Sequence, residues 1–219
     1  MFVTLEGPEG CGKSTQARLL LEYLHERLGE DKVILTREPG GTEIGEQIRN
    51  VIHSMRNMEM SPTTEFLLYN AARAQIVAEV IRPALDAGKL VLCDRFADST
   101  IAYQGYGRQL EMTMVKQVIK YATGGLKPDL TFYLDVSVEE GLARRVHGHS
   151  RGEEINRMDS QAREFYERAT RGYEIMMSQE PSRWVRIDGC RTVEQVQADL
   201  RKTLERILFQ STEPSKTVL

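Results

Sequence analysis

The residues with the most specific chemistry stand near the start of the chain, in the segment from Glu6 to Thr15. Four of them, Gly7, Gly12, Lys13 and Ser14, complete the pattern Gly-x-x-x-x-Gly-Lys-Ser of a phosphate-binding loop. Glycines allow backbone N–H groups to curl around a phosphate, Lys13 would reach the β- and γ-phosphates, and the Ser14 hydroxyl would bind Mg²⁺. We expect a nucleoside triphosphate to be bound by Gly7, Pro8, Glu9, Gly10, Cys11, Gly12, Lys13, Ser14 and Thr15.

The segments on either side of this loop supply the context that the motif requires. Residues 2–5 form an apolar run that suits a buried strand, and residues 16–24 have helical periodicity. The N-terminus of such a helix directs its positive end at the phosphate. Cys11 is interpreted as a small residue that suits a tight turn rather than as a reactive thiol.

Three further clusters carry arginines, carboxylates and an aromatic ring. They span residues 36–42, 66–75 and 93–105. In the second cluster Tyr69 and Arg73 stand four residues apart and would share one face of a helix. Because the expected strands are parallel, their carboxyl ends lie together, and we expect the three clusters to surround one cleft.

Phosphoryl transfer between two nucleotides needs these groups. It brings several negative charges together, and arginines with Mg²⁺ must neutralise them. An arginine fork suits an acceptor phosphate, and a flat aromatic ring suits a base. A closing lid is needed to exclude water, which would otherwise accept the phosphoryl group.

Other classes of nucleotide-binding protein fit less well. No Asn-Lys-x-Asp element is present to read guanine, as a regulatory GTPase requires. The extra early lysine of a partition-type ATPase is absent, because Pro8 and Glu9 occupy those positions. Small phosphoryl-transfer enzymes are therefore the leading class.

The elements that must position these residues alternate along the chain. Strands are predicted at 2–5, 33–36, 90–93, 130–134 and 184–187, with helices at 15–28, 42–54, 63–87, 111–122, 137–145, 160–180 and 192–209. This alternation predicts an α/β fold with a parallel sheet and right-handed crossovers. We expect a single domain over 1–210, a polar mobile loop at 147–154 between two helices, and a flexible tail at 211–219.

Composition excludes several kinds of partner. The 219 residues carry a net charge of −3, so no basic field indicates nucleic acid. No apolar run of 18 residues or secretory signal is present, which predicts a cytoplasmic protein without a membrane span. Three widely spaced cysteines, Cys11, Cys93 and Cys190, indicate neither a disulfide framework nor a zinc site.

The chain resembles the bacterial thymidylate kinases over about residues 1–208. The resemblance rests on the phosphate loop, on Arg-Glu-Pro-Gly-Gly-Thr at 37–42, on Ala-Ala-Arg at 71–73 and on the stretch from Asp94 to Gly105, which is the most specific part. It implies a P-loop nucleoside monophosphate kinase fold, with a five-stranded parallel sheet flanked by helices and a mobile lid at about 146–157. It also implies the reaction of ATP with dTMP to give ADP and dTDP, with Mg²⁺, in a homodimer.

The resemblance further implies roles at the acceptor's sugar and phosphate. Glu9 would lie near the 3′-hydroxyl and the metal, and Glu38 near the sugar and phosphate. The acceptor phosphate would be bound by Arg95 and Arg37. Tyr103 would crowd the 2′ position and favour deoxyribose.

At the base, Tyr69 would stack on thymine and Arg73 would donate to a pyrimidine carbonyl, according to the same resemblance. The pyrimidine site would also include Arg49, Thr100 and Gln104. Asp94 would join Ser14 in holding the magnesium, directly or through water.

No arginine is available in the phosphate loop to stabilise the transition state, so the chain resembles the subclass in which a lid arginine meets the phosphates. The lid region contains Arg144, Arg145, Arg151 and Arg157. We expect Arg151, between Ser150 and a glycine, to act with Lys13, Arg95 and Glu9 in catalysis. Arg157 stays possible, because the family's Asp-Arg-x-Glu element reads Asn-Arg-Met-Asp at 156–159.

Two alternatives remain open at this point. The first is a kinase for another nucleotide or for a deoxynucleoside, in which Glu38 would act as the base beside a 5′-hydroxyl. The second is a regulatory protein that binds a nucleotide without phosphoryl transfer, which would need neither the pyrimidine-site residues nor an arginine-bearing lid.

Overall fold

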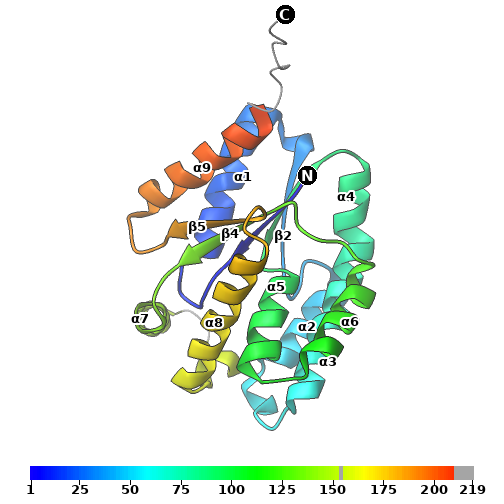
Figure 1. Cartoon of the computed structure of the whole chain (residues 1–219), viewed down its shortest axis with the longest axis vertical. Helices are drawn as coiled ribbons and strands as arrows, with labels where there is room; N and C mark the ends of the chain where they lie inside the picture. The colour runs from blue at the N-terminus through cyan, green and yellow to red at the C-terminus, as the bar shows by residue number, and fades with distance from the viewer. Residues whose placement is uncertain (153–154, 210–219) are drawn as a thin grey trace, which may run out of the picture.

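The computed structural model describes residues 1–152 and 155–209 and has a central sheet with helices on both faces (Figure 1). Five parallel strands, in the order β2-β3-β1-β4-β5, make the sheet. The strands are β1 Phe2–Glu6, β2 Val33–Arg37, β3 Leu90–Asp94, β4 Leu130–Asp135 and β5 Trp184–Asp188. The predicted α/β fold with a five-stranded parallel sheet is confirmed.

Helices connect the strands, as parallel pairing requires. They are α1 Lys13–Leu28, α2 Glu43–His53, α3 Pro62–Ile76, α4 Arg82–Asp86, α5 Ala97–Thr100, α6 Met112–Thr123, α7 Val138–Ser150, α8 Arg163–Gln179 and α9 Val193–Phe209. Short turns of other helical types lie at η1 Glu30–Lys32, η2 Met55–Asn57, η3 Val77–Ile81, η4 Ile101–Gly107 and η5 Arg157–Ser160. The expected domain of residues 1–210 and the tail at 211–219 extend beyond the described residues.

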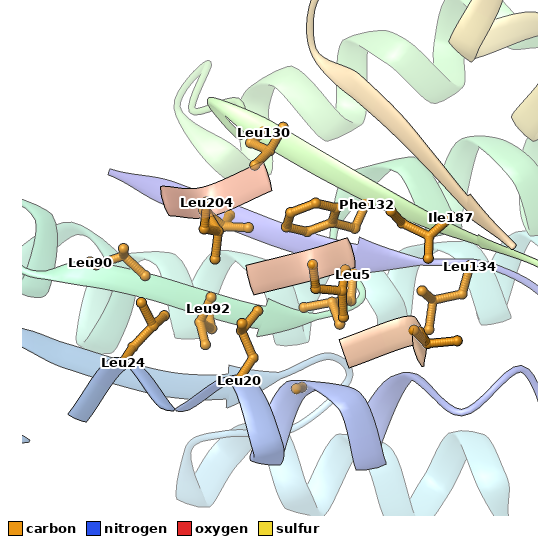
Figure 2. Close-up of a cluster of buried hydrophobic side chains, with 14 of the residues drawn as sticks. Leu5, Leu20, Leu24, Leu90, Leu92, Leu130, Phe132, Leu134, Ile187 and Leu204 are labelled. Carbon is orange, nitrogen blue, oxygen red and sulfur yellow. The ribbon is translucent and has the colours of Figure 1, made fainter. Parts of the chain in front are cut away.

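The core has separate layers on the two faces of the sheet because successive strand residues point to opposite sides. On one face Val3 and Leu5 pack with α1 and α9, and Figure 2 shows the leucines of this layer around Phe132. On the other face Phe2 packs against α3, η3 and α6. Toward the far edge, aromatic residues of α8 cover Tyr133 of β4. This packing presents the carboxyl ends of all five strands at one edge.

Two glycines allow the phosphate loop to sit close to that edge. Gly7 has φ +143°, and a Cβ there would lie 2.6 Å from the carbonyl oxygen of Leu134. Gly10 has φ +71°, and a Cβ there would clash with the carbonyl group of Gly141 in α7. Since real side chains do not approach backbone so closely, only glycine lets the loop pack on β4 and α7.

The helix predictions need three corrections. The expected helix at 63–87 is α3 and α4 joined by the π-helical turn η3. Residues 97–107 form α5 and η4. No helix was predicted there, because the glycines and β-branched residues of this segment obscure its helical period. The expected loop at 147–154 is wrong over its first half: α7 continues to Ser150 and ends before Gly152, which has φ +95°.

Candidate active site

A cavity of about 470 Å³ opens at the carboxyl ends of β1, β2 and β3. It brings together most of the residues that the sequence predicts for the site. The predicted residues in its wall are Glu9, Gly10, Gly12, Lys13, Ser14, Thr15, Arg37, Glu38, Arg49, Tyr69, Arg73, Asp94, Arg95, Thr100, Tyr103 and Gln104. The predicted residues outside its wall are Gly7, Pro8, Cys11 and Arg151. The phosphate loop and all three clusters therefore share one cavity.

The Lys13 ammonium group is bound by the phosphate loop itself. It donates to the carbonyl oxygens of Pro8 at 2.7 Å and Gly7 at 3.2 Å, and it lies 3.3 Å from Cys11 Sγ. The lysine side chain is thus buried at the place where phosphate oxygens would approach. An incoming triphosphate would exchange these carbonyl contacts for stronger contacts with phosphate charge.

Ser14 and Asp94 meet at the start of α1 and the end of β3. The Ser14 hydroxyl donates to Asp94 Oδ2 at 2.5 Å. Both are oxygen groups of the kind that Mg²⁺ prefers, and Mg²⁺ usually takes its other ligands from water and phosphate. Residues 1–152 and 155–209 contain no cluster of three or more His, Cys, Asp or Glu residues suited to a metal. The pair fits a magnesium ion that is bound together with a nucleotide.

Arg95 has an unusual backbone conformation and several partners in the cavity wall. Its φ of +70° is unusual for a residue with a side chain. The guanidinium group donates to Glu9 Oε1 at 2.8 Å and to the Gly7 carbonyl oxygen at 3.0 Å, and it lies 5.1 Å from the centre of the Tyr103 ring. Burial would raise the pKa of Glu9, but Arg95 and then Lys13 lower it to about 2. Glu9 is therefore a carboxylate at any pH of interest.

Beneath Arg95 lies a buried carboxylate that the sequence analysis missed. Glu6 accepts hydrogen bonds from the Phe96 N–H at 2.8 Å, the Ser99 hydroxyl at 2.6 Å and the Tyr173 hydroxyl at 2.8 Å. The two hydroxyl groups in turn accept from Arg95 at 3.1 and 3.4 Å. Burial raises the pKa of Glu6, and Asp98 raises it further. The position of Glu6, a charge at the end of a buried strand, was the only signal in the sequence.

Arg73 and Glu38 form a buried ion pair with an N–O separation of 2.6 Å. The guanidinium group also donates to Asn70 at 3.3 Å, Thr100 at 2.9 Å and the Phe96 carbonyl oxygen at 3.2 Å. Glu38 Oε1 is buried and has no hydrogen-bond partner among the described residues. Burial raises the pKa of Glu38 to about 7, even though Arg73 acts to lower it. A hydroxyl donor from a ligand would satisfy Oε1.

Comparisons with known proteins agree on one family. A sequence model of thymidylate kinase matches residues 5–200. A thymidylate kinase of Roseiflexus castenholzii is 49% identical over 217 residues, covering 95% of this chain and 94% of the relative. One from Exiguobacterium is 47% identical and covers 94% of this chain and 95% of the relative. The chain belongs to the thymidylate kinase family.

A solved structure supports this membership. The crystal structure of thymidylate kinase from Ehrlichia chaffeensis has a TM-score of 0.76 and 33% sequence identity, and the match covers 93% of this chain and 98% of that one. The resemblance drawn from the phosphate loop and the stretch 94–105 is thus confirmed. No described helix combines the length and apolar character needed to cross a membrane.

The arginines around the lid of this family member have different environments. Arg144 and Arg145 line the cavity; Arg144 donates to the Gly189 carbonyl oxygen at 3.0 Å, and Arg145 pairs with Asp159 at 2.8 Å. Arg151 is exposed and follows the end of α7. Arg157, in contrast, exposes 2% of its side chain and is bound to Glu65 at 2.5 Å and to the Ile52 carbonyl oxygen at 2.9 Å. Only a rearrangement would bring Arg157 to a phosphate.

The remaining predicted residues lie at the walls of the cavity. Arg49 donates to the Pro39 carbonyl oxygen at 3.0 Å, and the exposed Arg37 pairs with Glu46 at 3.0 Å. His53 also lines the cavity, although the sequence gave no reason to select it. Burial, and then Arg49, lower the pKa of His53 to about 4. The imidazole is therefore neutral near neutral pH.

Proposed function

We propose that this chain transfers the γ-phosphoryl group of ATP to the phosphate of dTMP, giving ADP and dTDP for nucleotide biosynthesis. Membership of the thymidylate kinase family supports this reaction. The observation that carries the proposal is the shared cavity, in which Lys13 and Ser14 face the same space as Tyr69, Arg73 and Arg95. A donor triphosphate and an acceptor nucleotide would thus meet in one place, which holds the reacting atoms in line.

For the donor, we propose that Lys13 leaves the carbonyl oxygens of the loop and binds the β- and γ-phosphates. The remaining residues from Gly7 to Thr15 would surround the phosphates with backbone N–H groups. Magnesium would be held by Ser14 and Asp94 together with phosphate oxygens, and it would neutralise charge on the transferring group. The acceptor phosphate is ionised near neutral pH, so no general base is required.

For the acceptor, we propose that Arg95 binds the phosphate, with Arg37 at the rim of the cavity. The 3′-hydroxyl would lie near Glu9 and the bound magnesium, and Tyr103 would crowd the 2′ position. Glu38 would lie near the sugar, where its unpartnered Oε1 can accept a hydrogen bond.

At the base, Tyr69 would stack on thymine, with Arg49, Thr100 and Gln104 around it. Arg73 would donate to a pyrimidine carbonyl. To do so it must exchange one of its present partners, and the hydrogen bond to Asn70, at 3.3 Å, is the longest of them. Retaining the Glu38 pair keeps the guanidinium group in place during this exchange.

We propose Arg151 as the lid arginine that meets the transferring phosphoryl group. Its exposure beyond the end of α7 leaves it able to move when the lid closes. Arg157 is less suited, because leaving its present place would remove one of the two arginine partners of the buried Glu65 carboxylate. Arg144 and Arg145 already line the cavity and would contact the donor nucleotide.

We also propose a single domain that acts as a homodimer in the cytoplasm. Ile44 and Val51 of α2 and Leu67 of α3 each expose about half of their surface, as do Met55 and Met58 between these helices. Such an apolar face would be covered by a second copy. Sedimentation of the protein, and of Leu67→Glu as a variant that charges this face, tests the assembly.

The reaction is tested by following ADP formation from ATP and Mg²⁺ with dTMP, dUMP, dCMP, dGMP, AMP and thymidine as acceptors. We expect dTMP to be the best acceptor and thymidine to be inert. Preferred phosphorylation of thymidine would indicate a deoxynucleoside kinase that uses Glu38 as base. ADP formation that is independent of every acceptor would overturn the proposed transfer.

A further inference from the structure

Another buried carboxylate lies behind the base end of the cavity. Glu65 of α3 has no exposed surface. Its Oε1 accepts from Gln104 Nε2 at 2.8 Å and from Arg108 Nε at 3.1 Å. Its Oε2 accepts from Arg108 Nη2 at 2.8 Å and from Arg157 Nη2 at 2.5 Å. One carboxylate thus connects a cavity residue of η4, the residue that follows η4 and the first residue of η5.

Glu65 remains ionised in this environment. Burial alone would raise its pKa, but hydrogen bonds and charge from Arg108, with Gln104 and Arg157, hold the pKa below its ordinary value. An ionised carboxylate can only accept hydrogen bonds. The group of Gln104 that faces Glu65 must therefore be the amide NH₂.

This constraint determines what Gln104 presents to a ligand. A glutamine amide has NH₂ at one end and a carbonyl oxygen at the other, and Gln104 lies in the cavity wall. With Nε2 directed at Glu65, Oε1 is left as the acceptor, and no hydrogen bond to it is found within residues 1–152 and 155–209. Thymine and uracil carry N–H at ring position 3, whereas cytosine carries a bare nitrogen there.

We propose that Glu65 is a positioning residue that fixes the amide of Gln104 and thereby makes the site select bases with N–H at ring position 3. Glu65 touches no substrate; it acts through Gln104. The inference rests on the proposed function, because it assumes that a pyrimidine monophosphate occupies this cavity. A site built to accept a hydrogen bond rejects a base that offers only another acceptor, since two facing lone pairs lose the bond and gain none.

Glu65→Gln is the decisive variant. The new amide has one oxygen and one NH₂. We expect the oxygen to take the place of Oε2, because an NH₂ there would oppose the Nη2 groups of both Arg108 and Arg157, whereas an NH₂ at the place of Oε1 opposes only Arg108 Nε. Its NH₂ then faces Gln104, which must turn its own oxygen toward it. The flipped Gln104 presents NH₂ to the cavity and can donate to the bare ring nitrogen of cytosine.

We expect the ratio of kcat/KM for dTMP to that for dCMP to fall by about 10-fold or more in Glu65→Gln. The ratio for dTMP to dUMP should stay within about 2-fold, because both bases offer the same N–H. Glu65→Asp is the matched control: it keeps an acceptor-only group, so its dTMP to dCMP ratio should remain close to that of the unaltered protein. A general structural defect would lower kcat/KM for dTMP, dUMP and dCMP together and leave the ratios between these substrates unchanged. An unchanged dTMP to dCMP ratio in a folded Glu65→Gln protein would overturn the proposal.

A measurement on the unaltered protein tests the orientation without any variant or turnover. In ¹⁵N-labelled protein, at least one side-chain amide proton of Gln104 should exchange slowly with solvent, because it is bonded to the buried Glu65. Rapid exchange of both protons would overturn the proposal even if Glu65→Gln fails to fold. Because this arm needs no substrate, it separates failure of the inference from failure of the proposed reaction, which would appear as inactivity toward every pyrimidine monophosphate.

Discussion

Ser14, in the first turn of α1, donates its hydroxyl hydrogen to Asp94 Oδ2 at the end of β3 over 2.5 Å. The contact exists because β1, which leads into the phosphate loop, pairs directly with β3, with Leu5 opposite Asp94. Two oxygen groups that are 80 residues apart in the chain thus lie together beside the phosphate loop, where a magnesium ion would bind with the nucleotide.

Replacing this carboxylate should weaken the use of magnesium. In Asp94→Asn we expect the Mg²⁺ concentration that gives half-maximal activity to rise by about 10-fold or more, as for other groups that orient a metal. Removal of metal with EDTA should abolish turnover of both proteins. Titrating activity with Mg²⁺ at fixed ATP measures the effect. An unchanged Mg²⁺ concentration at half-maximal activity would show that Asp94 does not help to bind the metal.

Removing the lysine of the loop should act mainly on the chemical step. Lys13→Ala loses a charge that stabilises the transferring phosphoryl group, so kcat should fall by about 100-fold or more. Binding of dTMP, measured by calorimetry without ATP, should change little. A large loss of dTMP affinity would mean that Lys13 supports the acceptor site rather than phosphoryl transfer.

Replacing Arg151 should affect turnover, whereas replacing Arg157 should affect the stability of the fold. Arg151→Ala should lower kcat by about 100- to 1,000-fold with an unchanged melting temperature, because the exposed side chain acts only after closure. Arg157→Ala should instead destabilise the fold by about 3 kcal/mol, since it removes a partner of the buried Glu65.

Steady-state kinetics and thermal unfolding of both variants distinguish these effects. Normal turnover in Arg151→Ala combined with lost turnover in a folded Arg157→Ala protein would assign the lid role to Arg157. Normal turnover in both would leave the phosphate charge to Lys13, magnesium and the arginines that already line the cavity.

Arg73 should matter for one substrate only. In Arg73→Ala we expect dTMP binding to weaken by about 1.5–3 kcal/mol, the range for a hydrogen bond to a charged group, while ATP affinity hardly changes. Calorimetric titration with each nucleotide tests this. An equal loss for both nucleotides would show that the Arg73–Glu38 pair supports the structure of the whole site instead.

His53 should make the fold sensitive to acid. Burial has the largest effect on this histidine and lowers its pKa from 6.5 to about 4. Among the charged groups that face it, Arg49 and Arg157 oppose its protonation, whereas Glu9 and Asp159 favour it. Between these values the unfolded chain binds a proton that the folded chain does not. Stability is therefore lost as pH falls from about 6.5 to about 4.

The contribution of His53 to that loss should be at most about 3 kcal/mol. In His53→Gln this part of the pH dependence should disappear. As the pH falls from about 6.5 to about 4, the unfolding free energy of the unaltered protein should therefore decrease relative to that of His53→Gln. Denaturant unfolding at a series of pH values measures it. Parallel pH profiles for the two proteins would contradict the buried, neutral state of His53.

Local patterns in the sequence were enough to identify the framework of the site. The strands and the phosphate loop are short-range features: an apolar run, a glycine spacing and a helical period each depend on neighbouring residues. The end of α7 was predicted too early for the same reason. The helix continues through Gly148 to Ser150, because a single glycine costs a helix only about 1 kcal/mol.

The sequence by itself determined the family, the α/β order of elements and most of the residues that face the cavity. Only the tertiary structure decided which charges are buried and with which partners. Glu6 and Glu65 read as ordinary acidic residues, yet each is enclosed by donors from distant segments. Arg157 and Arg151 look alike in the chain, but one is buried against Glu65 and the other is exposed. The reason is physical: a buried charge is stable only where several groups converge on it, and that convergence exists only after the chain has folded.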